Sequence, residues 1–517
     1  MGPPKIEVIV SGARPPAWQR WLLDELRSDD RSRVVRVTIA SPGQVPRLWR
    51  ALDAIDRWRE RRGRGALDRA GRAVDPKDDG EAVDLRLDLA GRSAEVSVET
   101  WRLRVAGDER YGLDAAPLGP LATADGMLRV LVTSAGIGCA SLVAEATAPL
   151  DRGSPAADLD AALWKGARLV AYAVRDLARG ALVRRPLPPL APAAPPRACV
   201  IAGALPRVVA AGLSHKAHDI STRREWAIGV RRKRWRTLRE RAGDGWRILR
   251  APPGTSWADP FLARHAGHRY LFFEEIDPTR RGSIRCGELN DDLSLGPTRP
   301  IALGGGGHLS YPYVFSNDGQ MYLVPETAAR RTVELWRAID PPWRWELEAT
   351  LLSDVRAADS TLIHHDGRWW LFTAIAAPHA TDREELSVFW SDGLDGPWQP
   401  HDGDPVITDA RWARPAGRPF VDAGRLIRPA QDCSLSYGRR IVLREVEVLT
   451  TSDYRERTIG TIGPEWARGS IAAHTFDHDD ALEVLDGRWV RRDAAFRFPR
   501  RAWRRSGTRA GSGVVRS

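Results

Sequence analysis

Cysteine is scarce in this chain of 517 residues, which contains four. Cys139, Cys199, Cys286 and Cys433 lie far apart and form no C-x-x-C pair, which excludes the usual zinc and haem signatures. Sparse, unpatterned cysteine is typical of a reducing compartment. No stretch approaches the ~18 apolar residues of a membrane-spanning helix, and the N-terminus MGPPKIEVIVSG does not resemble a leader peptide. The sequence therefore predicts a soluble, cytoplasmic protein without a transmembrane segment.

Motifs for nucleic-acid binding are also absent, although the formal net charge is +11. A basic protein can bind nucleic acid, an anionic membrane surface or an acidic substrate. Much of the surplus lies in two runs, at 231–234 and 497–505. Such runs are typical of solvated faces and tails. We therefore predict no nucleic-acid partner.

Tryptophan, in contrast, is abundant, with 21 residues. Its flat ring with a single N–H suits stacking on sugar rings as well as packing between sheets. Both uses remain open from composition alone.

The first part of the chain, residues 1–122, alternates short apolar strands with amphipathic helices. This alternation predicts a parallel, doubly wound α/β domain of the Rossmann-like type. The expected elements are strands at Lys5–Val10, Val34–Ile39 and Val83–Leu89 and helices at Ala17–Arg27 and Gln44–Arg59.

Residues 123–198 form a mixed α/β connecting segment. Strands are expected at Met127–Thr133 and Cys139–Thr147, followed by a helix over Ala157–Arg179. The segment ends in Pro186–Pro196, a proline-rich linker that marks a domain boundary.

Residues 199–492 contain an internal repeat, which consists of a strand, a glycine turn and a second strand. Its glycines recur 48 to 63 residues apart. A four-stranded propeller blade needs ~40–50 residues, and loops add more. The repeat predicts a five-bladed β-propeller, followed by a basic disordered tail at 493–517. A β-sandwich is the alternative, but it does not predict a hairpin at a fixed period. The five glycines are Gly267, Gly319, Gly367, Gly424 and Gly487.

Each repeat is a hairpin, and a hairpin returns the chain to the end where it began. This places Tyr311 beside Glu326, and likewise pairs Asp259 with Glu274–Glu275, Asp359 with Thr373, and Arg418 with Gln431. If the starting strands are innermost, these groups meet at one mouth of the central channel. Carboxylates held together shift each other's pKa, and two of them flanking a glycosidic bond can hydrolyse it. The catalytic candidates are Asp259, Glu326 and Asp359; the alternative is that such residues cap turns.

The segments WADPF (257–261) and ADSTLIHHDGRWWLF (358–372) resemble the propellers of glycoside hydrolase family 43 and the invertase group. The resemblance implies that Asp259 is a general base and that Asp359 orients a Glu general acid. The segment that matches the acid reads ARPAGRP (413–419) and contains no Glu. A hydrolase of that family is therefore expected to be inactive here, unless Glu326 or Glu275 substitutes.

The set SWADPF, LSYPYVF, VPET, ADSTL, GRWWLF, RPAGR and RPAQDC is similar to the N-terminal domain of the glucosamine inositolphosphorylceramide transferase family, over about residues 222–490. The plant enzymes carry their glycosyltransferase in a separate C-terminal domain, which has no counterpart here. The resemblance therefore implies the propeller but not the transfer activity.

The segments KIEVIVSG, PAWQRWLLDEL and VDLRLDLAGR, within about residues 4–120, resemble the N-terminal domain of the formyltransferase family. That family works with an Asn, a His and an Asp. The first region of this chain contains no His. A degenerate or repurposed fold is expected.

Arg414, Arg418 and Arg428 lie in or beside the fourth hairpin. They indicate an anionic sugar or a sugar phosphate as ligand, because the guanidinium fork matches phosphate or carboxylate. Alternatively, they pair internally with the carboxylates. The histidines at 308, 364, 365 and 474 are spread over separate repeats, so neither a metal site nor a cofactor is predicted. The predicted substrate-binding residues are Trp257, Glu275, Tyr311, Arg414, Arg418, Arg428 and Gln431.

These observations favour a carbohydrate-active protein whose propeller pocket binds or processes a glycan or sugar phosphate, either glycosidase-like or associated with glycosyl transfer. Two alternatives remain open. One is a non-catalytic glycan-recognition module, and the other is formyl or acyl transfer to an amino sugar by the N-terminal domain.

Overall fold

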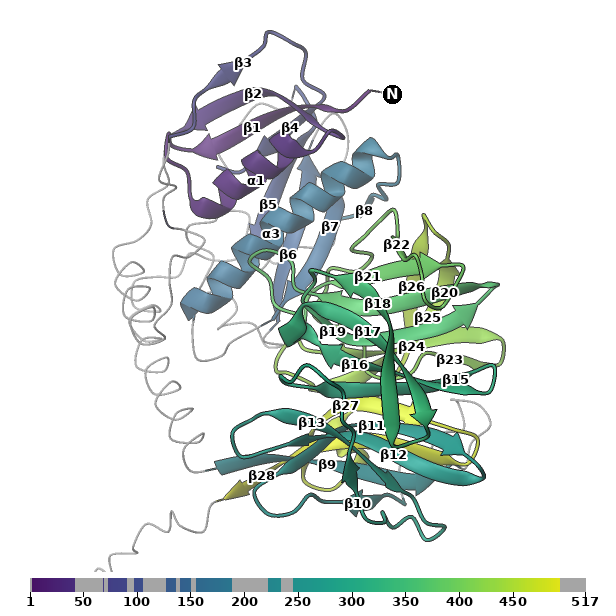
Figure 1. Ribbon diagram of the computed structural model, residues 1–517. Helices are drawn as coiled ribbons and strands as arrows, with labels where there is room; N and C mark the ends of the chain where they lie inside the picture. The colour runs from purple at the N-terminus through teal and green to yellow at the C-terminus, as the bar shows by residue number, and fades with distance from the viewer. Residues whose placement is uncertain are drawn as a thin grey trace, which may run out of the picture.

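The computed structural model describes residues 2–41, 68, 73–90, 97–105, 127–135, 140–149, 155–187, 222–233 and 245–492. In these residues the chain forms one eight-stranded sheet and then five four-stranded sheets, drawn in purple to blue and in teal to yellow in Figure 1. The helix expected at 44–59, most of the proline-rich linker and the tail at 493–517 lie outside the described residues.

The N-terminal sheet is mixed, with the strand order β3-β2-β1-β4-β5-β6-β7-β8. Its β2-β1-β4-β5 portion is parallel, as predicted, whereas all other neighbours are antiparallel. Residue 122 falls between β5 and β6 of this single sheet. The strands are β1 (Lys5–Ser11), β2 (Arg33–Ala40), β3 (Lys77–Asp78), β4 (Leu85–Asp88), β5 (Thr100–Val105), β6 (Leu128–Ala135), β7 (Ser141–Ala148) and β8 (Arg185–Pro186).

Two α-helices, α1 (Ala17–Ser28) and α3 (Pro155–Ala178), lie beside each other over the sheet (Figure 1). In α1, Trp18, Leu22 and Leu26 recur at helical spacing and are buried against the sheet core. Because β6, β7 and β8 return by antiparallel pairing and the described residues contain only these two α-helices, the predicted Rossmann-like arrangement is not shown. Of the helices that the structure describes, neither is long and apolar enough to cross a bilayer.

The five smaller sheets are the blades of a β-propeller, which confirms the predicted architecture. Contacts of β11 (Ser256–His265) with β15 (Ser310–Asn317) and with β27 (Ser470–His478) place the inner strands of neighbouring blades next to one another. Blade one consists of β11 (Ser256–His265), β12 (His268–Ile276), β13 (Gly282–Glu288) and β14 (Arg299–Pro300), and blade two of β15 (Ser310–Asn317), β16 (Gln320–Thr327), β17 (Thr332–Asp340) and β18 (Arg344–Ser353). Blade three consists of β19 (Ala357–His365), β20 (Arg368–Ile375), β21 (Leu386–Ser391) and β22 (Gln399–Pro400), and blade four of β23 (Phe420–Asp422), β24 (Arg425–Asp432), β25 (Arg440–Leu449) and β26 (Tyr454–Ile462).

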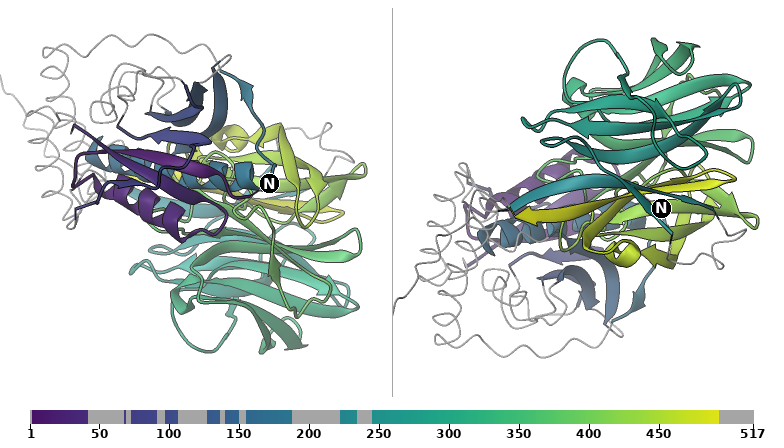
Figure 2. Two further views of the ribbon diagram at one scale, coloured as in Figure 1. Left: turned by 90° about the horizontal axis from the view of Figure 1, so that it is seen from above. Right: turned by 90° about the horizontal axis from the view of Figure 1, so that it is seen from below.

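The fifth blade joins the two ends of the propeller. Strands β9 (Thr222–Arg232) and β10 (Arg247–Leu249) precede the first blade, yet they share a sheet with β27 (Ser470–His478) and β28 (Leu482–Arg492). β9 pairs with β28 from Thr222↔Arg492 to Arg232↔Leu482, and the teal and yellow strands lie side by side in Figure 2. The antiparallel pairing closes the ring without leaving an open edge between first and last blades.

The hairpin turn predicted at Gly487 is wrong. Gly487 lies inside β28 opposite Ala227, and the β27–β28 turn falls at 479–481. A Cβ at Gly487 would lie 2.6 Å from the Trp466 side chain. This glycine therefore serves close packing, whereas the other four repeat glycines have positive φ in turns.

Gly417, at the junction of blades four and five, offers a test of this packing. It has φ 131° and bridges to Phe476, whose carbonyl oxygen would lie 1.8 Å from an added Cβ. We expect Gly417→Ala to lower the free energy of unfolding by about 3 kcal/mol or more, as measured by chemical denaturation. Gly424→Ala is the control: its φ is 77° but nothing lies within 4 Å of the added Cβ, so a cost of about 1 kcal/mol is expected. Equal effects would contradict the steric account.

Candidate functional site

A β-bulge recurs at the same register in the inner strand of four blades. In each, residue i pairs with j and residue i+3 with j−2, so two residues of the inner strand oppose one of its neighbour. At the bulge Asp259, Tyr311 and Asp359 have φ of 52°, 45° and 53°, a left-handed conformation that non-glycine residues rarely adopt. The bulged pairs are Ala258↔Glu274 with Phe261↔Phe272, Ser310↔Glu326 with Tyr313↔Val324, Ala358↔Ala374 with Thr361↔Phe372, and Ala473↔Gly487 with Phe476↔Leu485.

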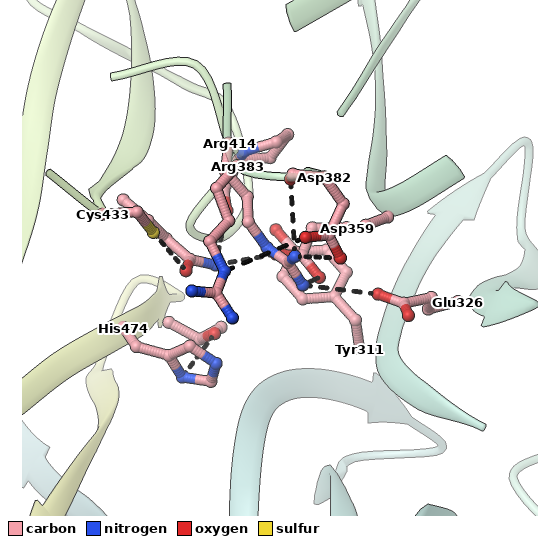
Figure 3. A network of polar contacts seen from close by, with 12 residues as sticks. Tyr311, Glu326, Asp359, Asp382, Arg383, Arg414, Cys433 and His474 are labelled. Atoms are coloured by element: carbon pink, nitrogen blue, oxygen red, sulfur yellow. Dashed lines mark hydrogen bonds and ion pairs between the residues drawn. The ribbon is translucent and has the colours of Figure 1, made fainter. Parts of the chain in front are cut away.

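The first cluster that these bulges build is centred on Arg414 (Figure 3). Its guanidinium donates to both carboxylate oxygens of Asp359, from Nε at 2.6 Å and from Nη2 at 3.1 Å. Nη1 lies 2.7 Å from Asp382 Oδ2, and Nη2 lies 3.6 Å from Glu326 Oε2. Gln431 Nε2 also donates to Asp359 Oδ2, at 2.7 Å. The predicted residues Glu326, Asp359, Arg414 and Gln431 therefore lie together.

The second cluster is centred on His474 and includes Asp259. His474 Nδ1 donates to Asp486 Oδ2 at 2.6 Å, and its Nε2 lies 3.5 Å from Asp259 Oδ1. The Thr475 hydroxyl donates to Asp259 Oδ1 at 2.6 Å, and the Tyr311 N–H donates to Oδ2 at 3.3 Å. Both oxygens of this buried carboxyl group thus have partners.

Tyr437 links the two clusters, because its hydroxyl lies 3.1 Å from His474 Nε2 and 3.4 Å from Arg414 Nη2. The three catalytic candidates consequently belong to one polar network that draws on blades one, two and three, with its cations supplied by blades four and five.

Burial and close approach shift the pKa of several of these groups. Burial, aided by the charges of Asp359 and Asp486, raises the pKa of Asp259 to about 6. Burial also raises the pKa of Glu326 well above its ordinary value, and Asp359 adds to this shift. Burial alone would lower the pKa of His474, but the carboxylates of Asp486 and Asp259 outweigh it and raise the pKa to about 9.

The trio Asp259, His474 and Asp486 also has the composition of a cation site, since its potential ligand atoms all lie within 4.8 Å of one another. However, His474 already donates to Asp486, and its raised pKa makes it an imidazolium at neutral pH. The positive charge between the two carboxylates is therefore provided by the histidine.

Of the remaining predicted site residues, Tyr311 takes part in the second cluster through its backbone N–H, and the others lie in separate networks. Trp257 Nε1 donates to Glu275 at 3.0 Å, and Glu275 also lies 3.3 Å from Arg285. Tyr311 is fully buried and its hydroxyl accepts the Gly417 N–H at 2.6 Å. Arg418 binds Asp477 and the Val314 carbonyl, and Arg428 binds Glu456 and the Trp412 carbonyl. Both arginines are thus engaged in internal contacts, separate from the Arg414 cluster.

Six residues of the network were not predicted: His474, Thr475, Asp486, Asp382, Arg383 and Tyr437. A signal for His474 was present, since AHTF (473–476) repeats the pattern and the register of ADPF (258–261). The glycine signature at Gly487 points to a different hairpin and so obscures this match. Asp382 and Arg383 lie in the loop between β20 and β21, where no repeat pattern points to them.

Comparison with known proteins agrees with the family resemblance predicted for about residues 222–490. Residues 250–491 match the family model described as glucosamine inositolphosphorylceramide transferase 1, N-terminal. The glucosamine inositolphosphorylceramide transferase 1 of Oryza sativa subsp. japonica is 35% identical over 244 residues, which is 46% of this chain and 33% of the relative. The Arabidopsis thaliana protein of the same name is 36% identical over 211 residues, or 40% of this chain and 27% of the relative.

The chain thus spans about a third of the length of these curated relatives. The family match begins at residue 250, and the formyltransferase resemblance of residues 4–120 stays a prediction. Among solved structures, the family 117 glycoside hydrolase Zg3597 of Zobellia galactanivorans is 12% identical, with a TM-score of 0.33, over 50% of this chain and 90% of that one. A thermostable family-43 glycoside hydrolase is 13% identical, with a TM-score of 0.31, over 40% of this chain and 76% of that one.

The raised pKa of His474 predicts a pH-dependent stability. Because the folded-state pKa of about 9 lies above the ordinary 6.5, the stabilisation is fully present below pH 6.5 and is lost as the pH rises through 9. We expect the free energy of unfolding to fall over this interval by on the order of 2 kcal/mol, measured by urea denaturation at a series of pH values. His474→Gln should flatten the dependence, whereas His268→Gln, at an exposed site, should not. A slope that survives His474→Gln would refute the assignment.

Proposed function

We propose that the channel mouth of the propeller binds a glycan or sugar phosphate, and that its carboxyl groups perform acid–base chemistry on this ligand, either glycosidase-like or associated with glycosyl transfer. The observation that carries the proposal is the gathering of Asp259, Glu326 and Asp359, from three blades, into one network around Arg414 and His474. The relatives' name, glucosamine inositolphosphorylceramide transferase, is consistent with a sugar ligand.

The environments of the three carboxyl groups favour three different roles. Glu326, whose pKa burial raises well above its ordinary value, is the candidate donor of a proton to a leaving oxygen. Asp259, with a pKa of about 6, is largely ionised at neutral pH and is the candidate acceptor of a proton from an attacking hydroxyl or water. Asp359 is held by Arg414 and Gln431, which suits a group that fixes charge and orientation rather than one that transfers a proton.

One observation favours a second function, which is glycan recognition without chemistry. The segment that supplies the acid in the resembling hydrolases here supplies Arg414, which binds Asp359 through two hydrogen bonds. In this alternative the same mouth binds the sugar, and the carboxyl groups act only as hydrogen-bond acceptors.

Conservative amide substitutions separate these functions. For Asp259→Asn and for Glu326→Gln we expect turnover to fall about 100-fold or more, because each removes one partner of the proton transfers. Sugar affinity should change by only a few-fold. The assays are isothermal titration calorimetry and mass-spectrometric product detection, using a panel of oligosaccharides, sugar phosphates and uronic acids.

The matched control is Asp366→Asn. Asp366 also has a left-handed φ, of 50°, but it is exposed in the β19–β20 turn at the opposite end of the hairpin. Full turnover in Asp259→Asn would exclude its catalytic role. Wild-type binding without any product would favour recognition, and the absence of binding across the panel would reject the proposal.

A further inference from the structure

The loop 376–385 links the polar network of the propeller to α3 of the N-terminal region. It joins β20 to β21, and its last four residues divide between two neighbours. Asp382 and Arg383 face the Arg414 cluster, as Figure 3 shows, while Glu384 and Glu385 contact α3.

On the α3 side the loop is held by a buried network of charges. Lys165 Nζ lies 2.9 Å from Glu384, and Arg168 donates to Glu384 at 2.8 Å and to Glu385 at 2.7 Å. All four side chains are at most 3% exposed. Breaking such a balanced buried set is costly, because a charge would remain unpaired in the interior. The backbone next to Arg383 is therefore firmly positioned.

A stacked ring pair adds to this attachment. Trp164 of α3 lies over His379 of the loop, with ring centroids 3.7 Å apart and an interplanar angle of 9°. The loop is thus fixed to α3 at both its middle and its end.

On the channel side, Arg383 differs from the other arginines of the propeller mouth. The N–H groups of Arg414 contact Asp359 and Asp382. Arg418 pairs with Asp477, and Arg428 pairs with Glu456. Arg383 lies over the Tyr437 ring, 4.9 Å from its centroid, and remains 40% exposed. Its Nε is buried without a hydrogen-bond partner among the described residues, and the nearest carboxylate, Asp382, lies 3.9 Å away.

Resting on the proposed function, we infer that Arg383 binds an oxyanion carried by the sugar ligand, either a phosphate or a carboxylate. The planar fork can donate two N–H groups to such an anion. Because α3 already fixes the loop, less conformational freedom is lost when the ligand binds. Arg383 therefore takes the anion-binding role that was predicted for Arg414, Arg418 and Arg428, all three of which have internal partners.

The test uses matched trios on the full chain: a neutral sugar, its 1-phosphate and its uronic acid, in the gluco, galacto and manno series, measured by calorimetry. We expect wild type to bind one anionic member more tightly than the neutral sugar. Arg383→Gln should lower the affinity for that anion about 10-fold or more, and should leave the neutral sugar within about two-fold. Arg383→Lys, which keeps the charge without the fork, should recover part of the loss.

Arg368→Gln is the matched control. Arg368 belongs to the same blade, is 35% exposed and lies over the Trp390 ring, but it sits by the turn at the opposite end of the hairpin. It should change none of the three affinities. If wild type binds no member of any trio, the proposed function fails. If it binds sugars but Arg383→Gln keeps the preference for the anion, or no preference exists, this inference fails while the proposed function stands.

Discussion

The guanidinium of Arg414 lies among three carboxyl groups, those of Glu326, Asp359 and Asp382. Groups of like charge cannot be gathered in a buried place unless a cation compensates them or some of them stay protonated. Both solutions are present here. Arg414 and His474 supply the positive charge, while burial raises the pKa of Glu326 well above its ordinary value and so favours its protonated form. The roles that we propose for the carboxyl groups rest on this charge balance.

The charge balance in turn depends on the backbone of the propeller. A bulge at the same register of the inner strand recurs in four blades, with a left-handed φ at Asp259, Tyr311 and Asp359. Closure through β9 and β28 holds the blades in a ring, so these strained positions stay next to one another. The buried ion network between α3 and the loop 376–385 extends the same rigidity to one rim of the mouth.

Hairpin turns and blade number could be predicted from sequence because they are local: Gly267, Gly319, Gly367 and Gly424 all have positive φ in turns. Gly487 has the same sequence signature but serves packing against Trp466, so the position it predicts for the fifth hairpin is wrong. Contacts between blades have no local sequence signature, so the sequence does not distinguish the partner of Arg414 from that of Arg418. The arrangement of the blades in the ring pairs Arg414 with Asp359 and Arg418 with Asp477. Likewise, an alternation of strands and helices does not show that β6 to β8 return by antiparallel pairing.

The central claim is that a sugar occupies the mouth defined by Asp259, Glu326 and Arg383. A crystal structure of the full chain soaked with a sugar phosphate that binds in solution tests it most directly. The account predicts a sugar ring within hydrogen-bond distance of Glu326 and Asp259, with its phosphate on Arg383. A sugar bound on another face, with these three side chains free of ligand contacts, would contradict it.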